Sequence, residues 1–237
     1  MGVVYRAYQE RLDRWIAVKV IFPDIADDPS FRARFEQESR LAAAIEHPSI
    51  LPVYDSGEVD GRLYIAMRLV EGSDLRTAIA RGGALEPARA ARIVAQVASA
   101  LDAAHARGLV HRDVKPANVL LARPGEPGEH AYLSDFGLTK RMASAGHTKT
   151  GEIVGTVDYM APEQWRGERV DGRADLYAIG AVLFEALTGS VPYVRDSDDR
   201  QALRAPQRRG AGSERCQVGC PRRAGRRRRA RPDQGSG

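Results

Sequence analysis

Two short stretches place polar side chains with complementary chemistry next to apolar runs. HRDVKPANVLL puts Asp113, Lys115 and Asn118 before an apolar segment, and SDFG puts Asp135 just after another. A carboxylate can accept or orient a hydroxyl proton, an ammonium group can neutralise a phosphoryl group, and carboxylate and amide oxygens bind magnesium. Together these residue types indicate phosphoryl transfer assisted by magnesium.

The elements that must position these residues begin with a small β-rich part. Strand-like runs lie at 3–8, 15–21, 51–55 and 63–69. One helix is predicted from Pro29 to Glu46, because proline suits a first helical turn and the preceding Asp28 can act as a cap. This pattern predicts an antiparallel lobe with one helix. Leu41, Ile45 and Ile50 are expected to be ordinary core residues.

Beyond these strands, the spacing of the apolar residues becomes that of helices. Ser73 can cap a short helix that runs to Arg81, and a longer helix is expected from Pro87 to Arg107, where Gly108 ends it. A single connection, MRLVEGSDL, joins the two parts. The expected fold is α+β, with a small antiparallel β lobe, a larger mainly α-helical lobe and a ligand-binding cleft between them.

Five motifs, AVKV, HRDVKPAN, DFG, APE and DLYAIG, occur in this order along the chain. With them the sequence resembles the protein kinases, specifically the bacterial eukaryotic-like serine/threonine kinases. The resemblance covers about residues 2–194. It implies a bilobal kinase domain at 1–195, with lobes at 1–70 and 71–195, that phosphorylates serine or threonine hydroxyls on proteins in signal transduction.

The resemblance also implies roles for individual residues. Asp113, Lys115 and Asn118 would be catalytic, and Asn118 with Asp135 would bind Mg²⁺ or Mn²⁺. The lysine of AVKV would hold the ATP phosphates and pair with a helix glutamate. The implied ATP-binding set is Gly2, Val4, Ala17, Lys19, Glu38, Met67, Arg68, Val70 and Leu120. The implied structural set is His111, Arg112, Phe136, Gly137, Thr156, Glu163 and Asp175.

Plainer explanations exist for several of these residues. Lys19 could be a solvated strand lysine, Asp135 a turn former and Asp175 a helix-start acid. His111 is expected to pack in the core and not to act as a base. The segment TKTGEIVGT predicts autophosphorylation at Thr148 and Thr150, with Arg112 pairing with the phosphates; an unmodified polar loop is the alternative.

The net charge of +5 comes from the C-terminal tail of the chain. Residues 195–237 hold 13 arginines and five acids, a balance of +8, so the rest carries about −3. The composition at 196–237 predicts disorder, and sequence-independent nucleic-acid binding by this tail is a minor alternative. No apolar run is long enough to span a membrane, and the two cysteines indicate no disulfide framework, so we expect a cytoplasmic protein. A longer gene product could still carry a membrane anchor.

Both ends depart from the kinase pattern. Only Gly2 remains of the expected glycine-rich loop, and Arg, Gly and Pro clusters stand where further helices are expected, which would leave Glu163 without its arginine partner. We therefore expect a domain truncated at both ends and poorly stable. Two hypotheses remain: an active kinase, with protein substrates and a kinase homodimer as partners, or an impaired fragment or pseudokinase that acts by nucleotide or partner binding.

Overall fold

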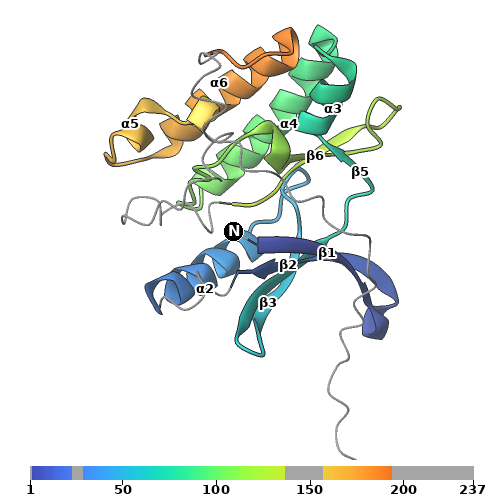
Figure 1. The fold of residues 1–237 in the computed structure, drawn as a ribbon, viewed down its shortest axis with the longest axis vertical. Coiled ribbons are helices and arrows are strands. Elements are labelled where there is room, and N and C mark those ends of the chain that lie inside the picture. The colour runs from blue at the N-terminus through green and yellow to red at the C-terminus, as the bar shows by residue number, and fades with distance from the viewer. Residues whose placement is uncertain (1, 23–28, 137–156, 194–237) are drawn as a thin grey trace, which may run out of the picture.

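The computed structural model describes residues 2–22, 29–136 and 157–193. Within these ranges the chain forms a lobe built on a four-stranded sheet and a lobe built mainly from helices, stacked along the long axis of the molecule (Figure 1). The α+β architecture expected from the sequence is thereby confirmed. The expected tail at 196–237 lies outside the described residues.

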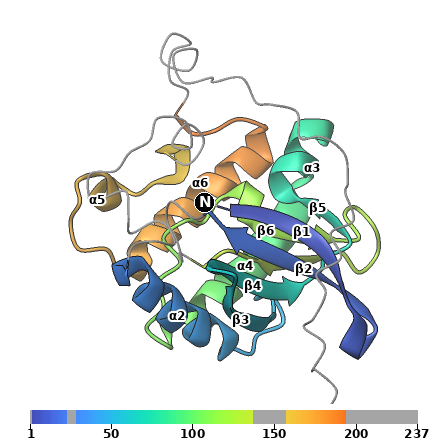
Figure 2. The ribbon, with the colours of Figure 1, turned by 60° about the horizontal axis from the view of Figure 1, so that its bottom comes forward.

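The sheet lobe contains four antiparallel strands in the order β1-β2-β4-β3. Helix α2 packs against β3 beside this sheet (Figure 2). A short 3-10 turn, η1 (Glu10–Leu12), connects the first two strands. The strands and the helix are β1 (Gly2–Gln9), β2 (Arg14–Ile21), β3 (Val53–Val59), β4 (Arg62–Arg68) and α2 (Pro29–Ala43).

The core of the sheet lobe forms where α2 meets the strands. Phe31 and Phe35 lie one helical turn apart on α2 and are almost fully buried, with ring centroids 6.1 Å apart. The predicted core positions Ile45 and Ile50 are confirmed as buried, in the core cluster of the helical lobe, but the prediction for Leu41 was wrong because its side chain is 36% exposed. Leu41 does not share the helix face that carries the two phenylalanines.

The connection between the lobes leads into a small second sheet of order β5-β6-β7. Its strands are β5 (Gly72–Asp74), β6 (Val119–Ala122) and β7 (His130–Leu133). The prediction that Ser73 caps the next helix was wrong, because Ser73 pairs with Leu121 in this sheet. Asp74 is the cap instead, and its carboxylate accepts a hydrogen bond from the backbone N–H of Thr77 at 2.7 Å.

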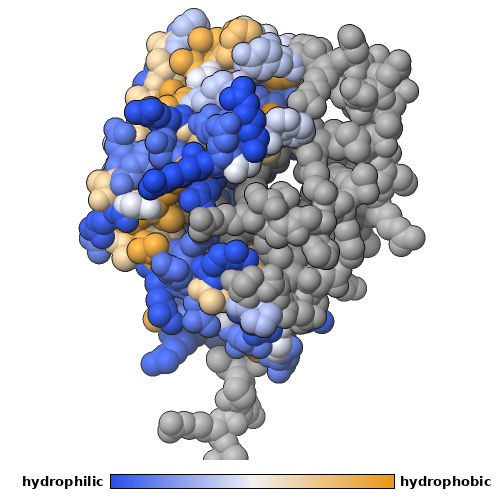
Figure 3. All heavy atoms as spheres, turned by 90° about the vertical axis from the view of Figure 1, so that its left-hand side faces the viewer, coloured by the Kyte–Doolittle hydropathy of each residue, from blue (hydrophilic) through white to orange (hydrophobic). Residues whose placement is uncertain are grey.

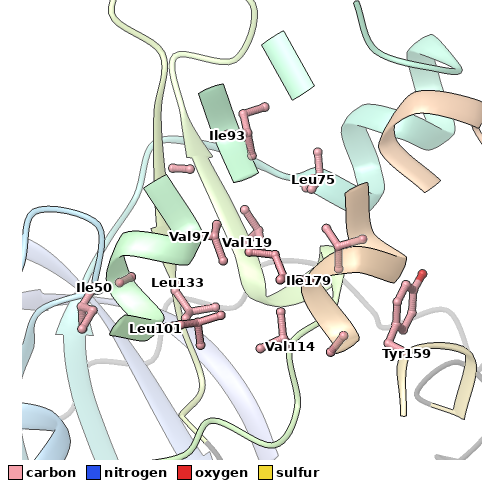
Figure 4. Packing of buried hydrophobic residues seen from close by; sticks show 14 of the residues in the cluster. Ile50, Leu75, Ile93, Val97, Leu101, Val114, Val119, Leu133, Tyr159 and Ile179 are labelled. Carbon is pink, nitrogen blue, oxygen red and sulfur yellow. The ribbon is translucent and has the colours of Figure 1, made fainter. Parts of the chain in front are cut away.

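The helical lobe packs around the predicted long helix. Its core is one contiguous cluster of buried residues from several elements, among them Val97, Val119 and Ile179 (Figure 4). The elements are α3 (Leu75–Gly82), α4 (Pro87–His105), η2 (Pro116–Asn118), η5 (Val157–Tyr159), α5 (Pro162–Trp165) and α6 (Gly172–Thr188). Gly108 follows α4 with a left-handed φ of 73°, in agreement with its predicted role as the stop.

Among the described residues on the face shown in Figure 3, most of the surface is hydrophilic, and hydrophobic surface gathers at the end formed by the helical lobe. Helix α6 contributes exposed apolar side chains, among them Leu176, Phe184 and Leu187. None of the helices in the described ranges has the length and apolar character needed to cross a membrane.

Candidate active site

The loop between α4 and β6 holds the predicted catalytic residues in direct contact. Asp113 is 5% exposed, and one of its carboxylate oxygens, Oδ2, accepts a hydrogen bond from Lys115 Nζ at 2.8 Å. Asn118 Nδ2 donates to the backbone oxygen of Asp113 at 2.8 Å and lies 3.3 Å from Oδ2. The short turn η2 produces this geometry because it folds Asn118 back over the loop. The three predicted catalytic residues therefore form one hydrogen-bonded group.

His111 connects this group to the segment that carries Asp135. Its Nε2 lies 2.9 Å from the carbonyl oxygen of Ser134, and its Nδ1 accepts from the backbone N–H of Asp113 at 3.2 Å. Because a carbonyl can only accept, Nε2 carries the proton and the ring is neutral. Complete burial lowers the pKa of His111, although the nearby Asp175 opposes this effect, so the ring stays neutral at pH 7. The ring also packs on Phe136, with centroids 4.8 Å apart.

The two predicted metal ligands are brought together by adjacent strand ends. The backbone N–H of Ser134 donates to the carbonyl oxygen of Asn118 at 2.9 Å, and Asp135 follows Ser134 directly. Since the amide nitrogen of Asn118 faces Asp113, its side-chain oxygen is left for another partner. A carboxylate and an amide oxygen suit Mg²⁺, which usually takes only one or two protein ligands and completes its shell with water and phosphate oxygens. The donor set therefore fits magnesium.

Lys19 reaches across from the sheet lobe to this site. Its Nζ lies 2.7 Å from Oδ1 of Asp135, and the lysine side chain is only 8% exposed. A solvated strand lysine is thereby excluded for this structure. Glu38 lies half-buried on α2. Its pairing with Lys19, which the sequence predicts, stays a prediction.

The face of the sheet that carries Lys19 also carries other residues of the predicted ATP-binding set. Val4 is the cross-strand partner of Lys19, and Met67 is the partner of Ala17. Directly paired residues share a face, and alternate residues of one strand do so too, so these side chains line one surface. Leu120 packs against the buried cluster that contains Ala17 and Met67. Val4, at 57% exposure, is the open member of this surface.

The remaining predicted nucleotide contacts lie at the edges of this region. Gly2 pairs with Ile21 at the start of β1, where an added Cβ would lie 2.3 Å from the carbonyl oxygen of Val20, so only glycine fits there. Arg68 is exposed at the end of β4 and Val70 is half-buried in the connection. Their roles toward ATP stay predictions.

Asp175 supports the catalytic loop from α6. This fully buried carboxylate accepts hydrogen bonds from the backbone N–H of His111 at 2.8 Å and of Arg112 at 2.7 Å. Its oxygen Oδ2 also lies 2.7 Å from Nε2 of His105. Asp175 is therefore neither the cap of α6, which is Asp171, nor a surface acid. Sequence reasoning missed His105, since nothing in its local pattern distinguishes it from other residues at a helix end.

Gly172 gives His105 the space to reach Asp175, which yields a testable prediction. A Cβ on Gly172 would lie 2.8 Å from Cε1 and Nδ1 of the His105 ring, so Gly172→Ala must displace the ring. We expect the free energy of unfolding in urea to fall by about 1 kcal/mol, the typical value of one hydrogen bond. Gly180→Ala is the matched control, because it lies in the same helix with open space around it. It should stabilise the protein by about 0.5–1 kcal/mol, and equal effects of both changes would contradict the prediction.

Gln164 is the second residue that sequence reasoning missed. Its Nε2 donates to the backbone oxygen of Arg112 at 2.9 Å, from a position 52 residues further along the chain. No local signal predicts this contact, because it exists only once α5 lies against the loop. Glu163, beside it, is half-buried and forms no ion pair within the described residues. Gly137, Thr148, Thr150 and Thr156 lie outside the described residues, as does the segment between DFG and APE up to residue 156.

Lys19 of the sheet lobe contacts Asp135 of the helical lobe, and this arrangement of fold and site suits phosphoryl transfer. Comparison with known families agrees with this class of chemistry, because the protein kinase domain profile matches residues 1–215. The chain belongs to the protein kinase domain family.

Curated relatives place it near the serine/threonine kinases of mycobacteria. The chain is 46% identical over 200 residues to the serine/threonine-protein kinase PknD of Mycobacterium tuberculosis, covering 84% of this chain and 30% of PknD. It is 46% identical over 197 residues to PknH of Mycobacterium bovis, covering 83% of this chain and 32% of PknH. The chain thus spans about a third of the length of these relatives. By family it is a protein serine/threonine kinase.

Solved structures agree on the fold. The crystal structure of the Mycobacterium tuberculosis PknI kinase domain matches with a TM-score of 0.67 and 39% identity, over 81% of this chain and 71% of that one. The crystal structure of Rad53 residues 1–466 in complex with AMP-PNP matches with a TM-score of 0.66 and 26% identity, over 84% of this chain and 47% of that one.

Proposed function

We propose that this chain transfers the γ-phosphoryl group of ATP to serine or threonine hydroxyls of proteins. The observation that carries the proposal is the hydrogen-bonded group of Asp113, Lys115 and Asn118, linked through His111 to the segment of Asp135. Asp113 would orient the acceptor hydroxyl, and Lys115 would neutralise charge on the phosphoryl group during its transfer. Incorporation of labelled phosphate into a protein substrate tests this conclusion.

ATP with magnesium is the proposed cofactor. Asn118 and Asp135 would hold the metal, which would neutralise the charge of the phosphates. Lys19 would orient the phosphates. Val4 and Ala17 would cover the adenine from the sheet lobe, with Leu120 on the opposite side, and Met67 would gate the back pocket. The Rad53 structure, which is a complex with AMP-PNP, supports nucleotide binding by this fold. Positioning and charge stabilisation would supply most of the rate.

Nucleotide binding gives a measurable stability change. A ligand that binds only the folded state stabilises it by about 2.7 kcal/mol when its concentration is about 100 times Kd. We expect ATP with magnesium to raise the melting temperature by several degrees, and we expect Lys19→Met to remove most of that shift because the phosphates lose their cation. Arg62→Met, exposed at the start of β4, is the control. A shift in Lys19→Met equal to that of the control would refute the role of Lys19.

Thr148 and Thr150 are the proposed autophosphorylation sites. Support comes from the threonines in the segment between DFG and APE, and from Arg112 beside the catalytic aspartate, which can pair with a phosphate. Protein co-expressed with a phosphatase and then incubated with ATP and magnesium should gain phosphate on at least one of these residues. Mass spectrometry that finds both unmodified, while a protein substrate becomes phosphorylated, would remove this part of the proposal.

A further inference from the structure

The peptide unit between Arg112 and Asp113 is held at both of its polar groups. Its carbonyl oxygen, on Arg112, accepts from Gln164 Nε2 at 2.9 Å, and its N–H, on Asp113, donates to His111 Nδ1 at 3.2 Å. A peptide unit is planar, so two such contacts fix its orientation. The Asp113 side chain is bonded to the Cα atom at one end of this plane. Any rotation of the plane would therefore move the carboxylate.

Arg112 itself has a backbone conformation that must be held in place. Its φ of 62° lies in the left-handed region, which residues other than glycine seldom occupy and which surrounding contacts must maintain. The N–H of Arg112 donates to Asp175 at 2.7 Å, and its carbonyl takes the hydrogen bond from Gln164. Asp175 is the first support of this conformation, and it holds the loop from α6. Gln164 is the second support, and it comes from a different helix.

The surroundings of Gln164 explain how one side chain can perform this task. Its Oε1 accepts from the backbone N–H of Ala161 at 3.1 Å, so the amide group is oriented with its nitrogen toward the catalytic loop. Other residues of the same helix, Pro162 and Trp165, line a cavity of about 260 Å³ that lies beside η5. Helix α5 therefore has one side at the catalytic loop and another at an open cavity.

We propose that Gln164 is a positioning residue that fixes the Arg112–Asp113 peptide plane and so the carboxylate of Asp113. The inference rests on the proposed phosphoryl transfer, in which Asp113 orients the acceptor hydroxyl. The amide nitrogen is the group that matters, since only a donor can serve the Arg112 carbonyl. The oxygen of the same amide serves helix α5 alone.

Gln164→Glu separates these two functions. A glutamate keeps an oxygen for the N–H of Ala161 and suits the first turn of a helix, but it places a carboxylate against the Arg112 carbonyl. We expect kcat to fall at least tenfold, with the KM for ATP within about twofold of the parent and the melting temperature nearly unchanged. A role limited to capping α5 predicts parental kcat. Gln37→Glu, on the exposed surface of α2, is the matched control for the same chemical change.

Amide hydrogen exchange supplies a readout that does not depend on activity. In Gln164→Glu, the peptide covering residues 109–118 should exchange at least fivefold faster than in Gln37→Glu, while the peptide covering α5 keeps its protection. Equal exchange of 109–118 in both variants overturns the proposal whatever the activity. If the parent transfers phosphate, an unchanged kcat in Gln164→Glu overturns it as well. A parent without transfer refutes the proposed function, and hydrogen exchange then still decides whether Gln164 holds the loop.

Discussion

Asp113→Asn lowers the rate of phosphoryl transfer by about 10²–10⁴-fold, the usual contribution of a positioned acid–base group, and leaves the affinity for ATP unchanged. Asparagine keeps the size of the side chain and an oxygen that can accept from Lys115 Nζ, so the local hydrogen bonds are largely retained. It loses the charge that we propose orients the acceptor hydroxyl. Because the proposed nucleotide contacts come from Lys19 and Asp135, binding should not suffer.

Initial rates with a protein substrate and isothermal titration with ATP and magnesium measure the two quantities separately. Asp102→Asn, exposed on α4, is the control for a neutralised aspartate in the same lobe. If Asp113→Asn transferred phosphate as fast as this control, the role assigned to Asp113 would be wrong. If it instead lost ATP binding, the two functions would not be separate as the site geometry indicates.

Asp175→Ala is expected to cause the largest loss of stability. Its carboxylate is fully buried and accepts from two backbone N–H groups of the catalytic loop. An unsatisfied buried donor costs about 1–3 kcal/mol, so the two N–H groups together predict a loss of about 2–6 kcal/mol. That loss is a large part of the roughly 5–15 kcal/mol by which typical proteins are stable.

Urea unfolding followed by circular dichroism measures this loss, with Asp102→Ala on the exposed side of α4 as the control. The loss in free energy of unfolding for Asp175→Asn should lie between those of the two alanine variants, since asparagine retains one acceptor oxygen for two donors. A loss below about 1 kcal/mol for Asp175→Ala would show that water or other groups replace the carboxylate, and the support of the loop would then need another explanation.

The sequence predicted the lobes well because periodicity and motifs are local signals. The β1, β2 and β4 strands and the long helix α4 were expected within about two residues of their observed ends, an accuracy typical of strongly periodic segments. Local signals failed where two residues compete for one task. Ser73 and Asp74 can both cap a helix, and pairing with β6 assigns Ser73 to a strand.

The residues that shape the site from a distance could not be predicted. His105 and Gln164 act through contacts with Asp175 and Arg112, across 70 and 52 residues of sequence. Such contacts depend on how α5 and α6 dock against the loop, which no pattern within a single segment encodes. Lys19 shows the same limit: the pairing expected from the sequence is with Glu38 and stays a prediction, whereas the contact with Asp135, 116 residues away, was not predicted. Charge complementarity alone does not predict that Asp135 contacts this lysine.

The most direct test of the central claim is transfer of the γ-phosphoryl group of ATP by the purified chain to a protein rich in serine and threonine, such as casein. With magnesium present, we expect label on phosphoserine and phosphothreonine and none on phosphotyrosine, at a rate at least a hundredfold above that of Asp113→Asn. Incorporation no greater than that of Asp113→Asn, by folded protein with saturating ATP, would contradict the claim that the Asp113 group performs phosphoryl transfer in this chain.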